Sequence, residues 1–363
     1  MGAACAGVPN EDQSHQHEGN PMEVKVKGIR ALGAGLLTVL AAALLAACGG
    51  DDSTDGTSAE GAPTEVAIGT QPWIGYGPLW VADDQGFDLD NGVDIKMVNF
   101  STDQDLESGF ASGKFQAASN ANNTYIRLAD LGIDYEITLM EDFSLTADAI
   151  VSCNPQIKSI DDLEGASVAF EEFSVSDVLF RYALNEAGID FDSIDYSPIP
   201  AADAGTAAVA GRVDVAVTYE PYLQAAIEEG DNCKIIYTAE ERPGLISDAL
   251  AFTPDFVESN PDAVIGVMKA WDDAVDFYNS NPDEAQAIIA KAVGEKPDAL
   301  GPSFEGVKLF DLQESQDFLE SDYATLWDDI GQIMLDQGQI KEVPDVNDYL
   351  NTEIGAEALG SSE

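Results

Sequence analysis

Residues 68–82 read IGTQPWIGYGPLWVA. A short apolar run leads into Gly69, glycine and aromatic residues follow, and from Pro78 onward the apolar residues return with helical spacing. Proline suits the first turn of a helix, because the N–H that it lacks would have no intrahelical partner there. The segment therefore predicts a strand, a loop and a helix. Loops after the carboxyl ends of strands are where open α/β sheets bind ligands.

The same alternation of strands and helices continues along the chain. Short apolar or β-branched runs occupy residues 65–68, 93–98, 149–151, 167–170, 213–218 and 234–237. Amphipathic segments lie between or after them, at 178–187, 202–210, 222–229, 262–279 and 282–292. This pattern predicts a mostly parallel α/β sheet. Because the chain is longer than one typical domain, it also predicts two lobes.

The amino-terminal part predicts export. Lys25, Lys27 and Arg30 precede an apolar segment at 31–47 that ends in Leu-Ala-Ala-Cys48. The apolar segment is shorter than the roughly 20 residues of a bilayer-spanning helix. Basic residues, then apolar residues, then small residues follow one another as they do in a signal peptide. The last four residues resemble the bacterial lipobox, which implies that Cys48 is lipid-modified and begins the mature chain. Cleavage near Ala47 with Cys48 as an incidental thiol is the alternative.

Two neighbouring segments complete this part of the prediction. Residues 1–21 hold acidic residues and both histidines, His15 and His17, and do not resemble a basic signal-peptide start. We therefore expect translation to begin at Met22, with residues 1–47 as leader and signal peptide. Residues 48–63 lack the aromatic and branched aliphatic side chains needed to bury apolar surface, so they predict a disordered tether.

Composition excludes several classes of function. The net charge is −51, which forbids routine binding of nucleic acid or of anionic membrane surfaces. Disorder is not the explanation, because 45% of the residues are hydrophobic and the strand and helix patterns are regular. We interpret the charge as an acidic surface suited to high salt, with an ordinary acidic bacterial protein as the alternative.

Cysteine and histidine are scarce beyond the leader. Only Cys153 and Cys233 follow Cys48, and an isolated pair in an exported protein predicts a disulfide; buried free thiols are the alternative. No histidine remains, so a Ser-His-Asp triad or a Cys/His nucleophile lacks its imidazole, and a zinc site lacks its usual ligands. The sequence therefore predicts no cofactor, no metal site and no enzymatic activity.

Three segments together resemble the nitrate/sulfonate/taurine-type solute-binding proteins of ABC importers, a group that includes thiamine-pyrimidine binders. They are 68–82, then 158–177 (KSIDDLEGASVAFEEFSVSD), then 211–222 (GRVDVAVTYEPY) with 243–250 (PGLISDAL). The resemblance spans roughly 64–340 and implies the type II periplasmic-binding-protein fold, in which two α/β lobes joined by two crossovers enclose a ligand cleft. It implies that 64–149 with 249–363 form lobe one and 150–248, with both cysteines, lobe two.

Within that framework, loop residues predict the cleft. Trp73 and Tyr76 offer aromatic faces. Asn120, Asn122 and Asn123 stand between a predicted strand at 115–119 and a predicted helix at 125–131. Ser174 and Ser176 begin another helix, whose N–H groups attract anions such as nitrate or sulfonate. Packing between loop and helix is the alternative for the aromatic residues, and turn formation for the asparagines.

Acidic residues beside the same motifs favour a different ligand. Glu171, Glu220 and Asp248 lie within these segments, and no lysine or arginine is adjacent to any of the three. A carboxylate in the cleft repels an anion and favours an ammonium or guanidinium group. Thr218, Tyr219 and Glu220 would give an organic cation a π-face and a carboxylate.

We therefore expect a monomeric, lipid-anchored solute-binding protein on the outer face of the cytoplasmic membrane or in the periplasm. It would capture a small nitrogen- or sulfur-containing solute of the nitrate/sulfonate/taurine type by lobe closure and deliver it to an ABC permease with its ATPase. The alternatives are a small organic cation or pyrimidine ligand, a tethered ligand sensor, and an enzyme of thiamine-pyrimidine synthesis, which would need histidine and clustered cysteines.

Overall fold

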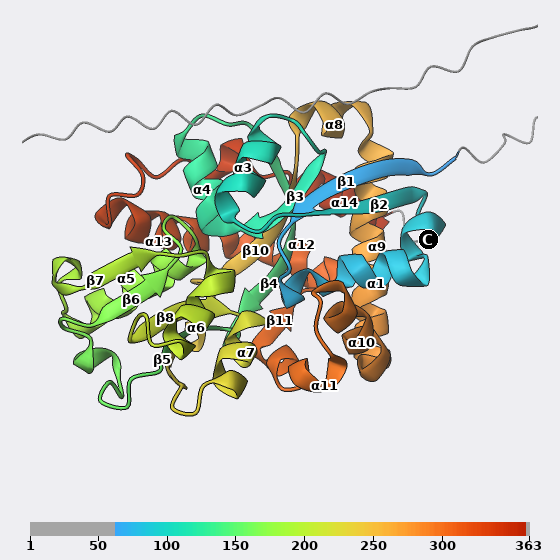
Figure 1. The fold of residues 1–363 in the computed structure, drawn as a ribbon. Helices are drawn as coiled ribbons and strands as arrows, with labels where there is room; N and C mark the ends of the chain where they lie inside the picture. The colour runs from blue at the N-terminus through green and yellow to red at the C-terminus, as the bar shows by residue number, and fades with distance from the viewer. Residues whose placement is uncertain (1–61, 361–363) are drawn as a thin grey trace, which may run out of the picture. The chain divides into compact units, whose positions relative to one another are not determined.

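The computed structural model describes residues 62–360 (Figure 1). The predictions for the leader at 1–47, for Cys48 and for nearly all of the 48–63 tether lie outside these residues. Within them, every helix is too short or too polar to cross a membrane.

The first sheet has six strands in the order β11-β4-β10-β3-β1-β2. Strand β1 pairs in parallel with β2 and β3, whereas β10 runs antiparallel to β3 and β4, and β11 antiparallel to β4. The bounds are β1 (Thr64–Thr70), β2 (Val93–Asn99), β3 (Ala117–Ala121), β4 (Glu136–Ser144), β10 (Ser247–Phe252) and β11 (Val307–Leu309).

The second sheet has five strands in the order β7-β6-β8-β5-β9. Strand β6 is parallel to β7 and β8, and β5 is antiparallel to β8 and β9. The bounds are β5 (Asp148–Ser152), β6 (Ser167–Phe170), β7 (Asp195–Pro198), β8 (Val215–Tyr219) and β9 (Lys234–Thr238). Figure 1 shows these green and yellow strands apart from the blue β1 and the teal β2 of the first sheet.

Both sheets are mixed, so the prediction of mostly parallel strands is wrong. The chain crosses from the first sheet to the second between β4 and β5, and returns between β9 and β10. A parallel neighbour needs a long crossover connection over the same sheet, whereas a strand that arrives from the other sheet can pair antiparallel. The predicted lobe boundaries, 149/150 and 248/249, fall inside β5 and β10 and stay a prediction.

Helices accompany the strands in chain order. Their bounds are α1 (Gly77–Gln85), α2 (Phe87–Asp90), α3 (Asp103–Ala111), α4 (Asn122–Asp130), α5 (Val175–Ala187), α6 (Ala201–Val209), α7 (Tyr222–Glu229), α8 (Pro254–Ser259), α9 (Pro261–Ser280), α10 (Pro282–Ala292), α11 (Pro297–Leu300), α12 (Leu312–Ser321), α13 (Tyr323–Asp336) and α14 (Thr352–Gly360). Short 3-10 turns are η1 (Ile74–Tyr76), η2 (Ile160–Asp162), η3 (Phe191–Ser193), η4 (Ala239–Glu241), η5 (Ser303–Gly306) and η6 (Val346–Asp348).

Helix boundaries follow from the local sequence. Pro78 lies in the first turn of α1. The helix ends at Gln85 and is followed by Gly86, whose φ of 81° is a left-handed conformation that glycine adopts without strain. Helix α5 begins after Ser174, whose hydroxyl accepts a hydrogen bond from the Ser176 N–H at 3.0 Å. This is N-cap geometry, in which a side-chain oxygen satisfies an otherwise unbonded donor.

Two tryptophans show how the core of the first sheet is held. Trp271 of α9 and Trp327 of α13 are completely buried. Each indole N–H donates to a backbone carbonyl, that of Phe310 at 2.8 Å and that of Pro344 at 2.9 Å. The rings therefore add large apolar contacts without leaving a polar atom unpaired.

A disulfide joins Cys153, just after β5, to Cys233, just before β9. The two strands are neighbours in the second sheet, and the bond closes a loop with a sequence separation of 80 residues. We expect the Cys153→Ser/Cys233→Ser variant to lose about 4 kcal/mol of unfolding free energy, because its unfolded chain regains loop entropy. Urea unfolding of both proteins measures this difference.

A second measurement checks the bond itself. The intact mass of exported protein, unfolded without reductant and treated with an alkylating agent, should show no modification at Cys153 or Cys233. Alkylation of both cysteines before reduction would contradict the disulfide.

Candidate functional site

The candidate site is a small cavity between the two sheets, with a volume of about 20 Å³. This volume is far below the roughly 300–1,000 Å³ of ligand pockets, and it is close to the space that one buried water needs. Loops and strand ends of both sheets form it. The lining residues are Gln71, Trp73, Tyr76, Asp103, Asn120, Ala121, Asp148, Val175, Tyr219, Ile246 and Asp248.

Aromatic rings form one part of the lining. Trp73, on the loop after β1, meets Tyr219, at the end of β8, edge to face with ring centroids 5.8 Å apart. Tyr222 also contacts Tyr219, with ring centroids 5.6 Å apart. Trp73 belongs to the first sheet and Tyr219 to the second, so this pair joins the two halves of the cavity. Both rings are nearly completely buried.

A pair of aspartates lies on the first sheet, and one of the two, Asp248, lines the cavity. Asp142 of β4 and Asp248 of β10 are directly opposite in the antiparallel pairing. The Trp73 indole N–H donates to Asp142 Oδ2 at 3.1 Å, and the Tyr76 hydroxyl donates to Asp248 Oδ1 at 2.7 Å. Gly75 leaves room for this arrangement, because a Cβ there would lie 2.2 Å from the Asp142 carboxylate.

The two aspartates hold protons differently. Burial, and then the negative charge of Asp248, raise the pKa of Asp142 well above its usual value. Burial raises the pKa of Asp248 only to about 6, because hydrogen bonds from Tyr76 and Asp142 favour its ionised form. At neutral pH the two coupled carboxyl groups therefore hold about one proton between them, and the remaining negative charge reaches the cavity through Asp248, which lines it.

Two more buried aspartates face the cavity, one from each side. Asp103 is the first residue of α3, and Asp148 is the first residue of β5. Burial raises the pKa of both to about 8; the charge of Glu171 adds to the effect at Asp103, and that of Asp248 adds to it at Asp148. Both carboxyl groups are thus ready to lose a proton near neutral pH.

No positive side chain compensates these carboxyl groups inside the cavity. None of the lining residues, all in the described part of the chain, is a lysine, arginine or histidine. Arg127 of α4 acts on Asp103 electrostatically, but its guanidinium forms an ion pair with Glu107. At neutral pH the cavity therefore combines aromatic faces with the negative charge of Asp248 and with two further aspartates, Asp103 and Asp148, that are mainly protonated but can ionise.

Five of the residues predicted from the sequence line this cavity: Trp73, Tyr76, Asn120, Tyr219 and Asp248. The structure places the others nearby but in different environments. Asn122 and Asn123 form the first turn of α4 instead of a loop before it. The Asn122 amide donates to Ser247 Oγ at 2.9 Å and accepts from the Tyr323 hydroxyl, so it ties α4 to β10 and α13.

The remaining predicted residues have partners of their own. Thr218 Oγ1 donates to the Ala201 carbonyl at 2.7 Å, and Ser174 with Ser176 forms the start of α5. Glu220 accepts from the Gln224 N–H at 3.0 Å and lines a different cavity with Ser303. The Glu171 carboxylate accepts from the N–H groups of Asp103 and Ala201, the first residues of α3 and α6. A ligand contact by any of these residues stays a prediction.

Sequence reasoning missed four polar residues at the cavity: Gln71, Asp103, Asp148 and, behind Trp73, Asp142. Gln71 lies inside the quoted 68–82 segment and could have been included with Trp73. Asp148 follows the first crossing between sheets, a position that no local pattern marks. Asp142 is recognisable only through its pairing with Asp248, which requires the order of the strands.

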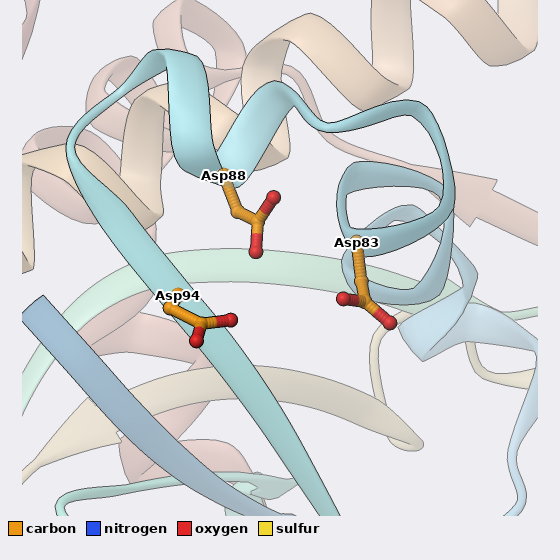
Figure 2. Close-up of side chains that lie close together, drawn as sticks. All are labelled: Asp83, Asp88 and Asp94. Atoms are coloured by element: carbon orange, nitrogen blue, oxygen red, sulfur yellow. The ribbon is translucent and has the colours of Figure 1, made fainter. Parts of the chain in front are cut away.

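A second group of carboxylates lies outside the cavity lining. Figure 2 shows Asp83 of α1, Asp88 of α2 and Asp94 of β2 facing one another. Asp88 accepts from the Leu89 N–H at 2.8 Å and from the Ile95 N–H at 3.0 Å, and Asp94 pairs with Lys96. Because both Asp88 oxygens already accept backbone hydrogen bonds, one of which joins α2 to β2, we assign this cluster a structural role.

Comparison with known proteins places these features in context. The model of the NMT1-like family matches residues 59–294. A Bacillus subtilis (strain 168) protein that is named as an aliphatic sulfonates-binding protein is 27% identical over 263 residues, which cover 70% of this chain and 77% of that protein. One of Escherichia coli (strain K12) is 31% identical over 145 residues, 40% of this chain and 45% of that protein. The match thus spans less than half of the Escherichia coli relative.

Solved structures share the fold. The periplasmic aliphatic sulphonate binding protein SsuA from Escherichia coli superposes with a TM-score of 0.67 and 20% identity, over 79% of this chain and 91% of that one. The periplasmic nitrate-binding protein NrtA from Synechocystis PCC 6803 gives 0.66 and 16%, over 83% and 89%. These likenesses confirm the predicted α/β periplasmic-binding-protein fold with its two crossings between sheets.

The kinship predicted from the three sequence segments is therefore confirmed. The family model covers most of the chain, and the relatives named above are binding proteins rather than enzymes. This chain belongs to the NMT1-like family and is similar to aliphatic sulfonate-binding and nitrate-binding proteins.

Proposed function

We propose that the protein is the extracytoplasmic solute-binding component of an ABC importer, anchored through a lipid on Cys48. It captures a small solute in the cavity between its lobes, 64–149 with 249–363 and 150–248, and delivers it to a membrane permease with its ATPase. Family membership, the fold and the lipobox-like LAAC sequence support this role.

Capture by closure agrees with the way the cavity is built. Trp73, Tyr76 and Asp248 come from the first sheet, whereas Asp148, Val175 and Tyr219 come from the second. A solute in the cavity contacts both sheets and so stabilises the closed arrangement relative to an open one. The permease can then distinguish a loaded protein from an empty one.

We further propose that the solute is a small organic cation, such as a guanidinium or alkylammonium compound. A single observation carries this choice: Asp103, Asp148 and Asp248 line the cavity, and no basic lining residue offsets them. Buried carboxylates are costly unless a counter-charge accompanies them. A cation supplies that charge, and the faces of Trp73 and Tyr219 attract it further.

A sulfonate or nitrate solute is the second candidate. The names of the Bacillus subtilis and Escherichia coli relatives favour it. An anion would enter this cavity only with its aspartates protonated, because ionised carboxylates would repel it. The two candidates therefore differ in the sign of their response to pH and to removal of an aspartate charge.

The first test neutralises Asp248. We expect Asp248→Asn to weaken binding of an organic cation about 10- to 100-fold, because a charge-assisted contact is lost. Isothermal titration at high salt with guanidinium, methylammonium, taurine, methanesulfonate, nitrate and a thiamine pyrimidine measures it. Asp83→Asn removes the same charge at an exposed site outside the cavity and should change nothing. Tighter binding of an anion to Asp248→Asn would instead support the sulfonate candidate.

The second test follows affinity with pH. Without ligand, Asp248 titrates at about 6 and Asp103 and Asp148 at about 8. A cation binds the ionised carboxylates, so it expels protons, and its affinity rises as pH increases from about 6 through about 8. Titrations in buffers of different ionisation enthalpy should show proton release. An affinity that falls over this interval would contradict a cationic solute, because anion binding takes up protons.

A further inference from the structure

The Glu171 carboxylate lies between two helix starts that belong to different sheets. Its Oε1 accepts from the Asp103 N–H at 3.1 Å, and its Oε2 accepts from the Ala201 N–H at 3.1 Å. Asp103 is the first residue of α3, which packs against β1 and β3 of the first sheet, and Ala201 is the first residue of α6, which packs against β6 and β8 of the second. One side chain thus bridges the two halves of the protein.

Both contacts use donors that a helix leaves free. The first N–H groups of a helix have no intrahelical acceptor, and the helix dipole makes that end positive, so it attracts an anion. In α3 the Thr102 hydroxyl accepts from the Asp105 N–H, which leaves the Asp103 N–H for Glu171. In α6 the residue before the helix is Pro200, which makes no side-chain cap. The carboxylate completes both helix starts.

The loop that carries Glu171 makes a second contact between the two halves. Phe173 has a φ of 63°, a left-handed conformation that is unfavourable for a bulky residue. Its ring lies 5.9 Å from the guanidinium of Arg127, which belongs to α4. The Ser174 hydroxyl donates to the Glu171 carbonyl at 2.8 Å. The loop from Glu171 to Ser174 is therefore fixed to the start of α5 while it contacts α3 and α4.

We propose that Glu171 is an internal anion that holds the cleft closed and sets the charge of the accepted solute. By occupying helix-start donors from both sheets, it takes contacts that an anionic solute would otherwise use. This inference rests on the proposed solute-binding function and deepens it. The Glu171 charge also helps to keep the neighbouring Asp103 protonated in the empty protein, which leaves Asp103 able to release its proton when a cation enters.

The experiment removes the internal anion and asks whether an external one replaces it. In the exported wild-type protein, acetate and methanesulfonate should not raise the melting temperature beyond the effect of chloride. In Glu171→Ala, acetate should raise it and should bind about tenfold more tightly than to wild type, because two helix starts become available. Glu172→Gln is the matched control, since it removes the adjacent charge, whose partner is the Tyr196 hydroxyl.

Amide hydrogen exchange reports on the same two donors. We expect exchange at Asp103 and Ala201 to accelerate in Glu171→Ala and in the isosteric Glu171→Gln, and to slow again when acetate is added to Glu171→Ala. Circular dichroism of Glu171→Gln verifies that the variant is folded. Unchanged exchange at both amides, or equal acetate binding by wild type and Glu171→Ala, would overturn the proposal. Failure of the protein to bind any solute would appear only in the solute titrations.

Discussion

Burial of acidic groups where the two sheets meet is the constraint on which the rest of the site depends. Asp142 and Asp248 are opposite one another on β4 and β10, and Asp103 and Asp148 approach from α3 and β5. Water cannot solvate these carboxyl groups fully, so each needs a donor or a proton. Trp73 and Tyr76 supply donors to the central pair. The aromatic loop of residues 68–82 therefore supports the carboxyl groups as well as covering the cavity.

The same constraint distinguishes this chain from a simple anion receptor of its fold. The N-termini of helices attract anions. At α3 and α6, however, a carboxylate of the protein itself already occupies this position. Fold and family alone do not determine the ligand, because function resides in the side chains at the site. Here the lining side chains carry negative charge and aromatic surface, while helix-start donors beside them are occupied.

The sequence predicted the elements that depend on local patterns. The strand, loop and helix around Trp73 and the start of α5 at Ser174 appear as expected. The antiparallel placement of β10 could not be predicted, because it depends on the chain returning from the other sheet. For the same reason Asp142 escaped notice, although Asp248 did not. Glu220 was predicted as a ligand contact because it follows Tyr219 directly. After the turn that ends β8, however, its side chain lines a different cavity.

The strand order has a mechanical consequence. The chain leaves the first sheet from β4 and returns to β10, and these two strands are neighbours; it enters the second sheet at β5 and leaves from β9, which are neighbours as well. The Cys153–Cys233 bond fastens the latter pair together. Two short connections that run beside each other form a hinge. A hinge of this kind allows one half to rotate against the other and resists sliding and twisting.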